Sequence, residues 1–297
     1  MPNVKVKGIQ IEYDTFGEAG SRPLLMIKGV GQQMITWSDD FCSLLAKAGH
    51  YVIRFDHRDV GLSSKLENEK TPELAEFVAA LARGEKIKPP YTLDDMAADA
   101  IGLLDALGID KANVCGMSMG GYIAEILAIS YPSRLLSLTL MMTSTGNPDI
   151  PPAKPEAMAA ILAPQPDQRQ AYIEHHVKTF RTLGSPKFTF NEGYHRQLAG
   201  KLFDRSFYPV GMTRHLMAVL SQENRKPALG GLKIPALIIH GVADPLVPVE
   251  GGKDAAEAIP GSETLFIEGM GHDLPAEVWP AVVEAMTKNT AKGQSVK

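Results

Sequence analysis

Cysteine is scarce in this chain, with only Cys42 and Cys115 among 297 residues. A disulfide framework needs more cysteines and an oxidising compartment, so both are expected to be buried free thiols. The first residues lack the continuous apolar region of a secretory signal, and no stretch approaches about eighteen uninterrupted apolar residues. The sequence therefore predicts a cytoplasmic protein without membrane insertion.

An excess of positive charge is also lacking. The 30 Lys and Arg residues stand against 34 Asp and Glu, which gives a net charge of -4, and no basic stripe is visible. Nucleic acid is therefore not an expected partner, because binding to phosphates requires a basic surface. The eight histidines show no spacing of the H-E-x-x-H type, so neither a metal nor a cofactor is expected.

What the chain does have is a hydrophobic fraction of 44%, enough for a sizeable core. Residues 4–7 and 9–16 alternate apolar and polar side chains, which predicts an opening hairpin. Later apolar runs are continuous, which is typical of parallel strands covered on both faces. These runs are residues 24–27, 51–55, 135–142, 236–240 and 263–268.

Helical patterns separate these runs, which predicts an α/β fold: a mostly parallel central sheet with helices on both faces. A final helix is expected over residues 276–287, followed by a frayed tail from Lys288. Residues 148–229 interrupt the rhythm with helical, proline-rich sequence and no convincing buried strand. We therefore expect a core of residues 1–147 and 230–297 with an inserted helical cap of residues 148–229.

A candidate nucleophile lies in the pentapeptide G-M-S-M-G at residues 116–120, between a strand-like run and a helix-like stretch. A serine on a sharp strand-to-helix turn exposes its hydroxyl for attack on a carbonyl. The two glycines fit the same geometry, because a Cβ at either position would separate strand from helix. Ser118 is the predicted nucleophile.

A serine hydroxyl needs a base and an orienting carboxylate, and after such a turn the acid precedes the histidine along the chain. His272, on a glycine-flexed loop after the last predicted strand, fits the base. The other seven histidines precede Ser118, fall in the insertion or end a strand. Asp244, after the preceding strand, fits the acid, with Asp149 as a weaker substitute.

Two backbone amides are expected to stabilise the oxyanion of the tetrahedral intermediate. Met119, directly after the nucleophile, supplies one. Val30, between two glycines after the first central strand, supplies the other. The substrate pocket is expected to include Gly29, Gly31, Gln32 and Met270.

These motifs resemble those of the serine α/β-hydrolases. The sequence D-H-R-D-V-G-L-S at residues 56–63 resembles the family's D-x-R-x-x-G-x-S turn, and the insertion matches its cap. The resemblance implies the α/β-hydrolase fold and a triad of Ser118, Asp244 and His272. Lys28 departs from the pattern, since the family usually has histidine there.

Within that family, four segments are similar to the aclacinomycin methylesterase branch, whose members cleave a methyl ester on a polyketide. They are residues 37–41, 52–59, 116–120 and 269–272. The resemblance implies a carboxylic ester hydrolase that forms an acyl enzyme from a small or medium apolar ester. Cap residues decide the substrate, so the physiological ester is not predicted, and neither is the oligomeric state.

Three alternatives remain open. A proline iminopeptidase would share the triad but needs cap acids for the substrate's amine. The available acids are Glu156, Glu174, Glu192 and Glu223. A lactonase or a hydrolase of carbon-carbon bonds could use the same residues on another substrate. A small-molecule binding protein on the hydrolase scaffold would keep the pocket but turn over little.

Overall fold

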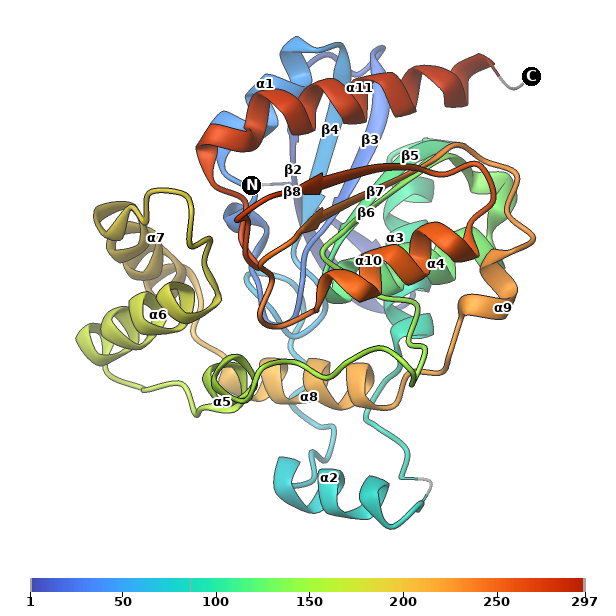
Figure 1. The fold of residues 1–297 in the computed structure, drawn as a ribbon. Helices are drawn as coiled ribbons and strands as arrows, with labels where there is room; N and C mark the ends of the chain where they lie inside the picture. The colour runs from blue at the N-terminus through green and yellow to red at the C-terminus, as the bar shows by residue number, and fades with distance from the viewer. Residues whose placement is uncertain (1, 86, 296–297) are drawn as a thin grey trace.

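The computed structural model describes residues 2–85 and 87–295, and within them eight strands form a sheet in the order β1-β2-β4-β3-β5-β6-β7-β8 (Figure 1). The strands are β1 (Asn3–Val6), β2 (Ile9–Phe16), β3 (Arg22–Ile27), β4 (His50–Phe55), β5 (Ala112–Met117), β6 (Leu135–Met141), β7 (Ala236–Gly241) and β8 (Glu263–Ile267). Strand β2 pairs antiparallel with β1 and with β4, and the other pairings are parallel. The predicted hairpin and mostly parallel sheet are confirmed.

Helices cover both faces of the sheet, each over its own apolar cluster (Figure 1). One face carries α1 (Asp39–Lys47) and α11 (Trp279–Ser295), and the other carries α3 (Leu93–Ala106), α4 (Met119–Ser130) and α10 (Val249–Ala258). The strands supply both clusters because successive side chains point to opposite faces. In β3, Leu25 and Ile27 join one cluster, whereas Leu24 and Met26 join the other.

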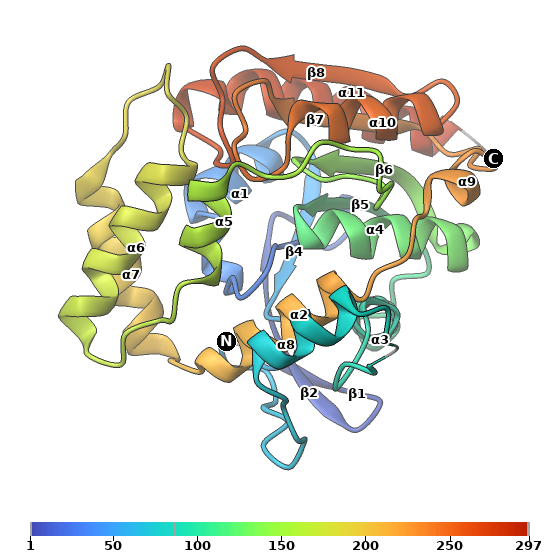
Figure 2. The ribbon, with the colours of Figure 1, turned by 60° about the horizontal axis from the view of Figure 1, so that its bottom comes forward.

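Helices alone follow β6 until β7 begins, as the sequence pattern predicts (Figure 2). They are α5 (Pro155–Leu162), α6 (Arg169–Leu183), α7 (Glu192–Arg205), α8 (Pro209–Leu220) and α9 (Lys226–Leu229). A further helix, α2 (Leu74–Ala82), lies beside α8, with Phe77 and Ala80 buried. The helices α5 to α8 lie beyond the carboxyl ends of the parallel strands (Figure 1). In sheets of this kind, the loops at that edge form the ligand-binding site.

The predicted frayed tail from Lys288 is wrong, because α11 continues to Ser295. Its last turns are held by polar contacts that an apolar pattern does not reveal. Asn289 Nδ2 donates to the Leu138 carbonyl at 2.9 Å, and Thr290 Oγ1 lies 2.8 Å from His50 Nε2. Both side chains are fully buried. The expected free thiols are confirmed, since Cys42 and Cys115 are buried and unbridged.

Candidate functional site

Ser118 lies between β5 and α4 in a backbone conformation that few residues adopt, with φ 56° and ψ -124°. Such strain persists only where the surroundings enforce it, and it marks functional sites. A Cβ on Gly116 would lie 2.0 Å from the Gly120 carbonyl oxygen, and one on Gly120 would lie 2.2 Å from the Ile27 carbonyl oxygen. The expected lack of room at both glycines is confirmed, and the turn leaves Ser118 partly exposed.

Asp244 and His272 meet although they come from different loops, after β7 and β8. The His272 Nδ1 lies 2.7 Å from the Asp244 Oδ2, and both side chains are buried. The second carboxylate oxygen of Asp244 accepts from the Leu246 and Val247 amides, each at 2.9 Å. These amides fix the carboxylate, which in turn orients the ring with its Nε2 free to accept a proton.

The distance from Asp244 to a second histidine is longer. His240 Nε2 lies 3.7 Å from the Asp244 Oδ2 but 2.8 Å from the Val247 carbonyl oxygen, to which it donates. Burial lowers the pKa of His240, so its ring stays neutral. His240 is thus a core neighbour of the pair, as its place at a strand end predicts.

The loop after β3 passes directly beside the serine. A Cβ on Gly29 would lie 3.5 Å from the Ser118 Oγ. Neither the Val30 amide nor the Met119 amide donates to another group within residues 2–85 and 87–295. No hydrogen bond joins Ser118 to His272 in that part of the chain, and catalytic hydrogen bonds are often loose without substrate.

Two buried imidazoles hold the ends of this loop. His57 Nε2 donates to the Lys28 carbonyl oxygen at 3.0 Å, and the Gly31 amide donates to His215 Nδ1 at 3.2 Å. Burial lowers the pKa of His57 to about 4 and that of His215 to about 3, so both rings are neutral. His215 belongs to α8, within the insertion, and is fully buried.

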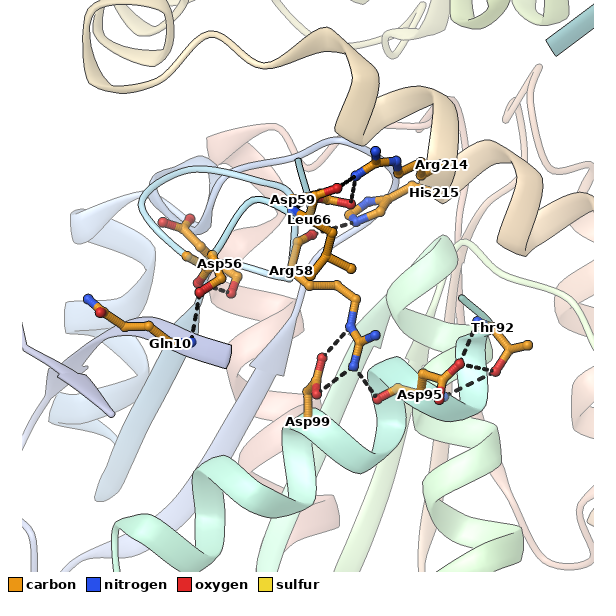
Figure 3. Close-up of polar contacts among 12 residues, drawn as sticks. Gln10, Asp56, Arg58, Asp59, Leu66, Thr92, Asp95, Asp99, Arg214 and His215 are labelled. Carbon is orange, nitrogen blue, oxygen red and sulfur yellow. Dashed lines mark hydrogen bonds and ion pairs between the residues drawn. The ribbon is translucent and has the colours of Figure 1, made fainter. Parts of the chain in front are cut away.

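Contacts within the turn at residues 56–63 account for the residue types in its sequence motif (Figure 3). Gly61 has φ 55°, and a Cβ there would lie 2.1 Å from the Asp56 Oδ2. Asp56 accepts from the Met34 and Leu62 amides, and Ser63 donates to the Asp56 carbonyl oxygen at 2.7 Å. The motif is therefore a structural unit beside the loop of residues 28–31.

The same turn binds elements that lie far apart in the sequence (Figure 3). Arg58 forms a two-pronged ion pair with Asp99 of α3. Asp59 pairs with Arg214 of α8 at 3.0 Å, and Asp56 pairs with Arg205 of α7 at 2.7 Å. Helices α7 and α8 are thus anchored to the turn by buried ion pairs.

A cavity of about 640 Å³ opens between the helices α6 and α7 and the carboxyl edge of the sheet. Its walls are mainly aromatic and apolar, and it contains His272 together with Met117, the residue before Ser118. Gln32 lines it as predicted. Gly31 instead lines a smaller neighbouring cavity together with Val30. Such a concave, largely apolar space suits a small organic ligand.

The predicted pocket role of Met270 is wrong, because its side chain is fully buried in an apolar cluster and does not line the cavity. Lys28 contributes to the cavity wall instead. Its Nζ lies 3.3 Å from the Met117 Sδ and 4.1 Å from the centre of the Trp37 ring. Burial lowers the pKa of Lys28 to about 8. The departure from histidine at this position was the only sequence signal for it.

Among the described residues, no group of three or more His, Cys, Asp or Glu side chains could hold a metal ion. Over the same part of the chain, no helix is both long and apolar enough to cross a membrane.

Comparison with known proteins identifies the family. Residues 22–277 match the family described as alpha/beta hydrolase fold. Rhodomycin D methylesterase from Streptomyces peucetius is 30% identical over 296 residues, which cover 92% of each chain. The 3-oxoadipate enol-lactonase 2 from Acinetobacter baylyi is 26% identical over 288 residues, which cover 94% of each chain.

A solved structure shows the same fold. The meta-cleavage product hydrolase from Pseudomonas fluorescens superposes with a TM-score of 0.75 at 19% identity, over 98% of both chains. The family match extends from β3 to the loop after β8 and so includes the Ser118 turn, Asp244 and His272. This chain belongs to the α/β-hydrolase family.

Proposed function

We propose that this protein is a serine hydrolase of carboxylic esters, with Ser118 as nucleophile, His272 as base and Asp244 as the orienting acid. The observation that carries the proposal is the 2.7 Å hydrogen bond from His272 to Asp244, because His272 lines the same cavity as Met117, the residue directly before the strained Ser118. Similarity to a methylesterase over 92% of the chain supports the ester as substrate class.

In the proposed reaction, the Ser118 Oγ attacks the ester carbonyl while His272 Nε2 takes the hydroxyl proton. The alcohol then leaves with that proton as the tetrahedral intermediate collapses to an acyl enzyme. Water repeats the attack, His272 again accepts and returns a proton, and the acid is released. Asp244 holds the ring orientation and stabilises the imidazolium in both halves.

The oxyanion of each intermediate is assigned to the amides of Val30 and Met119. The free state of both amides and the closeness of Gly29 to the Ser118 Oγ support this role. His57 and His215 keep the Val30 loop in place. We further propose that residues 148–229 form the cap, whose α7 side chains Tyr194 and Leu198 shape the substrate cavity.

The cap acids do not favour a proline iminopeptidase. Glu192 lines the cavity but pairs with Arg181 and Arg196, and Glu174 pairs with Arg196 as well. An amine would have to displace these arginines. A lactonase or carbon-carbon bond hydrolase would use the same triad, and similarity to an enol-lactonase makes lactones the second substrate class.

The test is a panel of short-chain 4-nitrophenyl esters, lactones and a proline arylamide. We expect ester hydrolysis, and Ser118→Ala should lower kcat by a factor on the order of 10⁴ or more. A fluorophosphonate should label the wild type at Ser118 and leave the variant unlabelled. Ser221→Ala, at the end of α8, is the control and should keep full activity.

Ester hydrolysis that survives Ser118→Ala would exclude the proposed nucleophile. Faster turnover of a lactone or of the arylamide would keep the triad but move the protein to another substrate class. Tight binding of ester without turnover would instead favour a binding protein on this scaffold.

A further inference from the structure

Lys28 stands out in the cavity wall because its amine is buried without a counter-ion. The residue is only 8% exposed, yet it lines the same cavity as His272. Its Nζ contacts the Met117 thioether and the face of the Trp37 ring. No carboxylate lies within ion-pair distance of it anywhere in the described ranges 2–85 and 87–295.

These two contacts do not satisfy an ammonium group. It has three hydrogens to donate, and a thioether is a weak acceptor. A buried cation without strong acceptors is costly, and burial accordingly lowers the pKa of Lys28 to about 8. From that pKa, roughly nine in ten Lys28 side chains carry the charge at pH 7. The cavity therefore contains a cation that lacks strong acceptors among the protein groups of residues 2–85 and 87–295.

The other titratable groups around Lys28 and its cavity do not supply the missing charge. They are Cys42 of α1, Cys115 of β5, His57 after β4, Glu192, Tyr194 and His195 of α7, and His272, Asp273 and Glu277 after β8. Burial raises the pKa of the Tyr194 hydroxyl, which is therefore neutral. Burial raises the pKa of both thiols and lowers that of His57 and His195, so these four are neutral. The acids are bonded elsewhere, Glu192 to arginines, Asp273 to Ser185 and Glu277 to the Thr189 amide.

We propose that Lys28 binds a carboxylate of the substrate, so that this enzyme selects esters that carry an anionic group. A carboxylate supplies the acceptors that the ammonium lacks and cancels its charge, and the hydrogen bond is charge-assisted. The aromatic rings of Trp37, Phe41 and Trp279 line part of the cavity and suit an apolar chain between carboxylate and ester. The identity of the ligand as an ester rests on the proposed function.

The test compares esters that differ only in a carboxylate. One pair carries it on the acyl side, as mono-4-nitrophenyl adipate against 4-nitrophenyl hexanoate. A second pair carries it on the alcohol side, as 4-carboxyphenyl hexanoate against phenyl hexanoate. The measured quantity is the ratio of kcat/KM for the anionic ester to that for the neutral one, after subtraction of spontaneous hydrolysis.

We expect the wild type to prefer the anionic ester in at least one pair, and Lys28→Met to lower that ratio at least tenfold. Lys154→Met removes a cation from the wall of the neighbouring cavity and should leave the ratio unchanged. Equal losses for both esters of each pair would overturn the proposal, because they would mean a role at the oxyanion or in packing. Equal effects of the two lysine variants would also overturn it.

A second measurement needs no substitution at Lys28. In the wild type, the ratio should fall as the pH rises through about 8, because kcat/KM reports the free enzyme and Lys28 loses its proton there. Dependence on His272 cancels in the ratio, and the substrate carboxylate stays ionised above about pH 6. A ratio that stays constant from pH 6 to about 9.5 would contradict anion binding by Lys28.

Binding to Ser118→Ala separates this inference from the proposed function. By calorimetry, monomethyl adipate should bind this variant at least tenfold more tightly than methyl hexanoate, and adding Lys28→Met should remove the difference. If the difference is present but the wild type cleaves no ester, the proposed function fails and anion binding stands. If esters are cleaved through Ser118 without any carboxylate preference, only the Lys28 proposal fails.

Discussion

The Gly31 amide donates to the Nδ1 of His215 across 3.2 Å, and this one contact fixes the state of the ring. The Nε2 of His215 lies 3.0 Å from the Arg58 carbonyl oxygen, to which it can only donate. The neutral ring with its proton on Nε2 satisfies both contacts. A second proton would leave the Gly31 amide without its acceptor, so α8 holds the loop of residues 28–31 only while His215 is neutral.

We expect the free energy of unfolding to fall in acid, because His215 and His57 are buried as neutral rings. Burial lowers the pKa of His215 to about 3 and that of His57 to about 4, against about 6.5 in an unfolded chain. Below pH 6.5 the unfolded chain therefore binds protons that the folded protein excludes. The free energy of unfolding should decrease from pH 6.5 towards 4, by about 1.4 kcal/mol per pH unit for each histidine.

Urea denaturation between about pH 4.5 and 7.5 measures the slope of the free energy of unfolding against pH. His215→Gln should reduce it by roughly the contribution of one proton, whereas His175→Gln, on a partly exposed part of α6, should reduce it less. An unchanged slope in His215→Gln would mean that His215 is already protonated in the folded protein.

Asp244→Asn should lower kcat by a factor on the order of 10³ to 10⁴, because an amide can hold His272 in the wrong tautomer. The fold should survive, since one side-chain oxygen can still accept from the Leu246 and Val247 amides. Asp149→Asn is the matched control, at an exposed position beyond β6. A large loss in Asp149→Asn with a mild one in Asp244→Asn would move the acid to the earlier loop.

Gly116→Ala should destabilise the protein by about 3 kcal/mol, because the new methyl group would overlap the Gly120 carbonyl oxygen. The strained turn of Ser118 would shift as well, so specific activity should fall even in the folded fraction. Gly20→Ala, where a Cβ meets nothing within 4 Å, is the control and should leave stability unchanged. Equal stability of both variants in urea denaturation would mean that strand and helix can separate at the turn.

Arg214→Met should cost about 3 to 5 kcal/mol of stability, because it leaves the buried Asp59 carboxylate without its partner. Adding Asp59→Asn removes the stranded charge and should recover part of the loss, which a double-mutant cycle measures. The exposed pair of Arg169 and Asp204 offers a control, and Arg169→Met should change stability little. No recovery in the double variant would mean that Arg214 acts through its bonds to Thr71 and to backbone carbonyls.

The sequence predicts well those elements whose structure depends on residues close together in the chain. Continuous apolar runs predict the central strands, and the glycines around Ser118 predict a turn without room for a Cβ, which the contacts of Gly116 confirm. The 2.7 Å contact of Asp244 with His272 agrees with the predicted pair. The order of these two residues along the chain is enough to predict that they meet, because loops after neighbouring parallel strands lie at one edge of the sheet.

Contacts between distant elements are harder to predict from the sequence. Nothing near His215 or Arg214 in the sequence points to residues 28–31 or to Asp59, because these contacts depend on how α8 docks. Met270 was misplaced because a loop residue beside His272 turned inward to the core. Asn289 and Thr290 were assigned to a frayed end because buried polar bonds leave no apolar pattern.

The anchoring of α7 and α8 to a single turn limits how these helices can be exchanged between relatives. Arg205 and Arg214 neutralise the two aspartates of the turn, so a chimaera that replaces residues 148–229 without them would strand two buried carboxylates. A graft must also bring a histidine equivalent to His215, or the amide of Gly31 would lose its acceptor. A replacement for residues 148–229 therefore has to keep equivalents of Arg205, Arg214 and His215 to preserve these contacts.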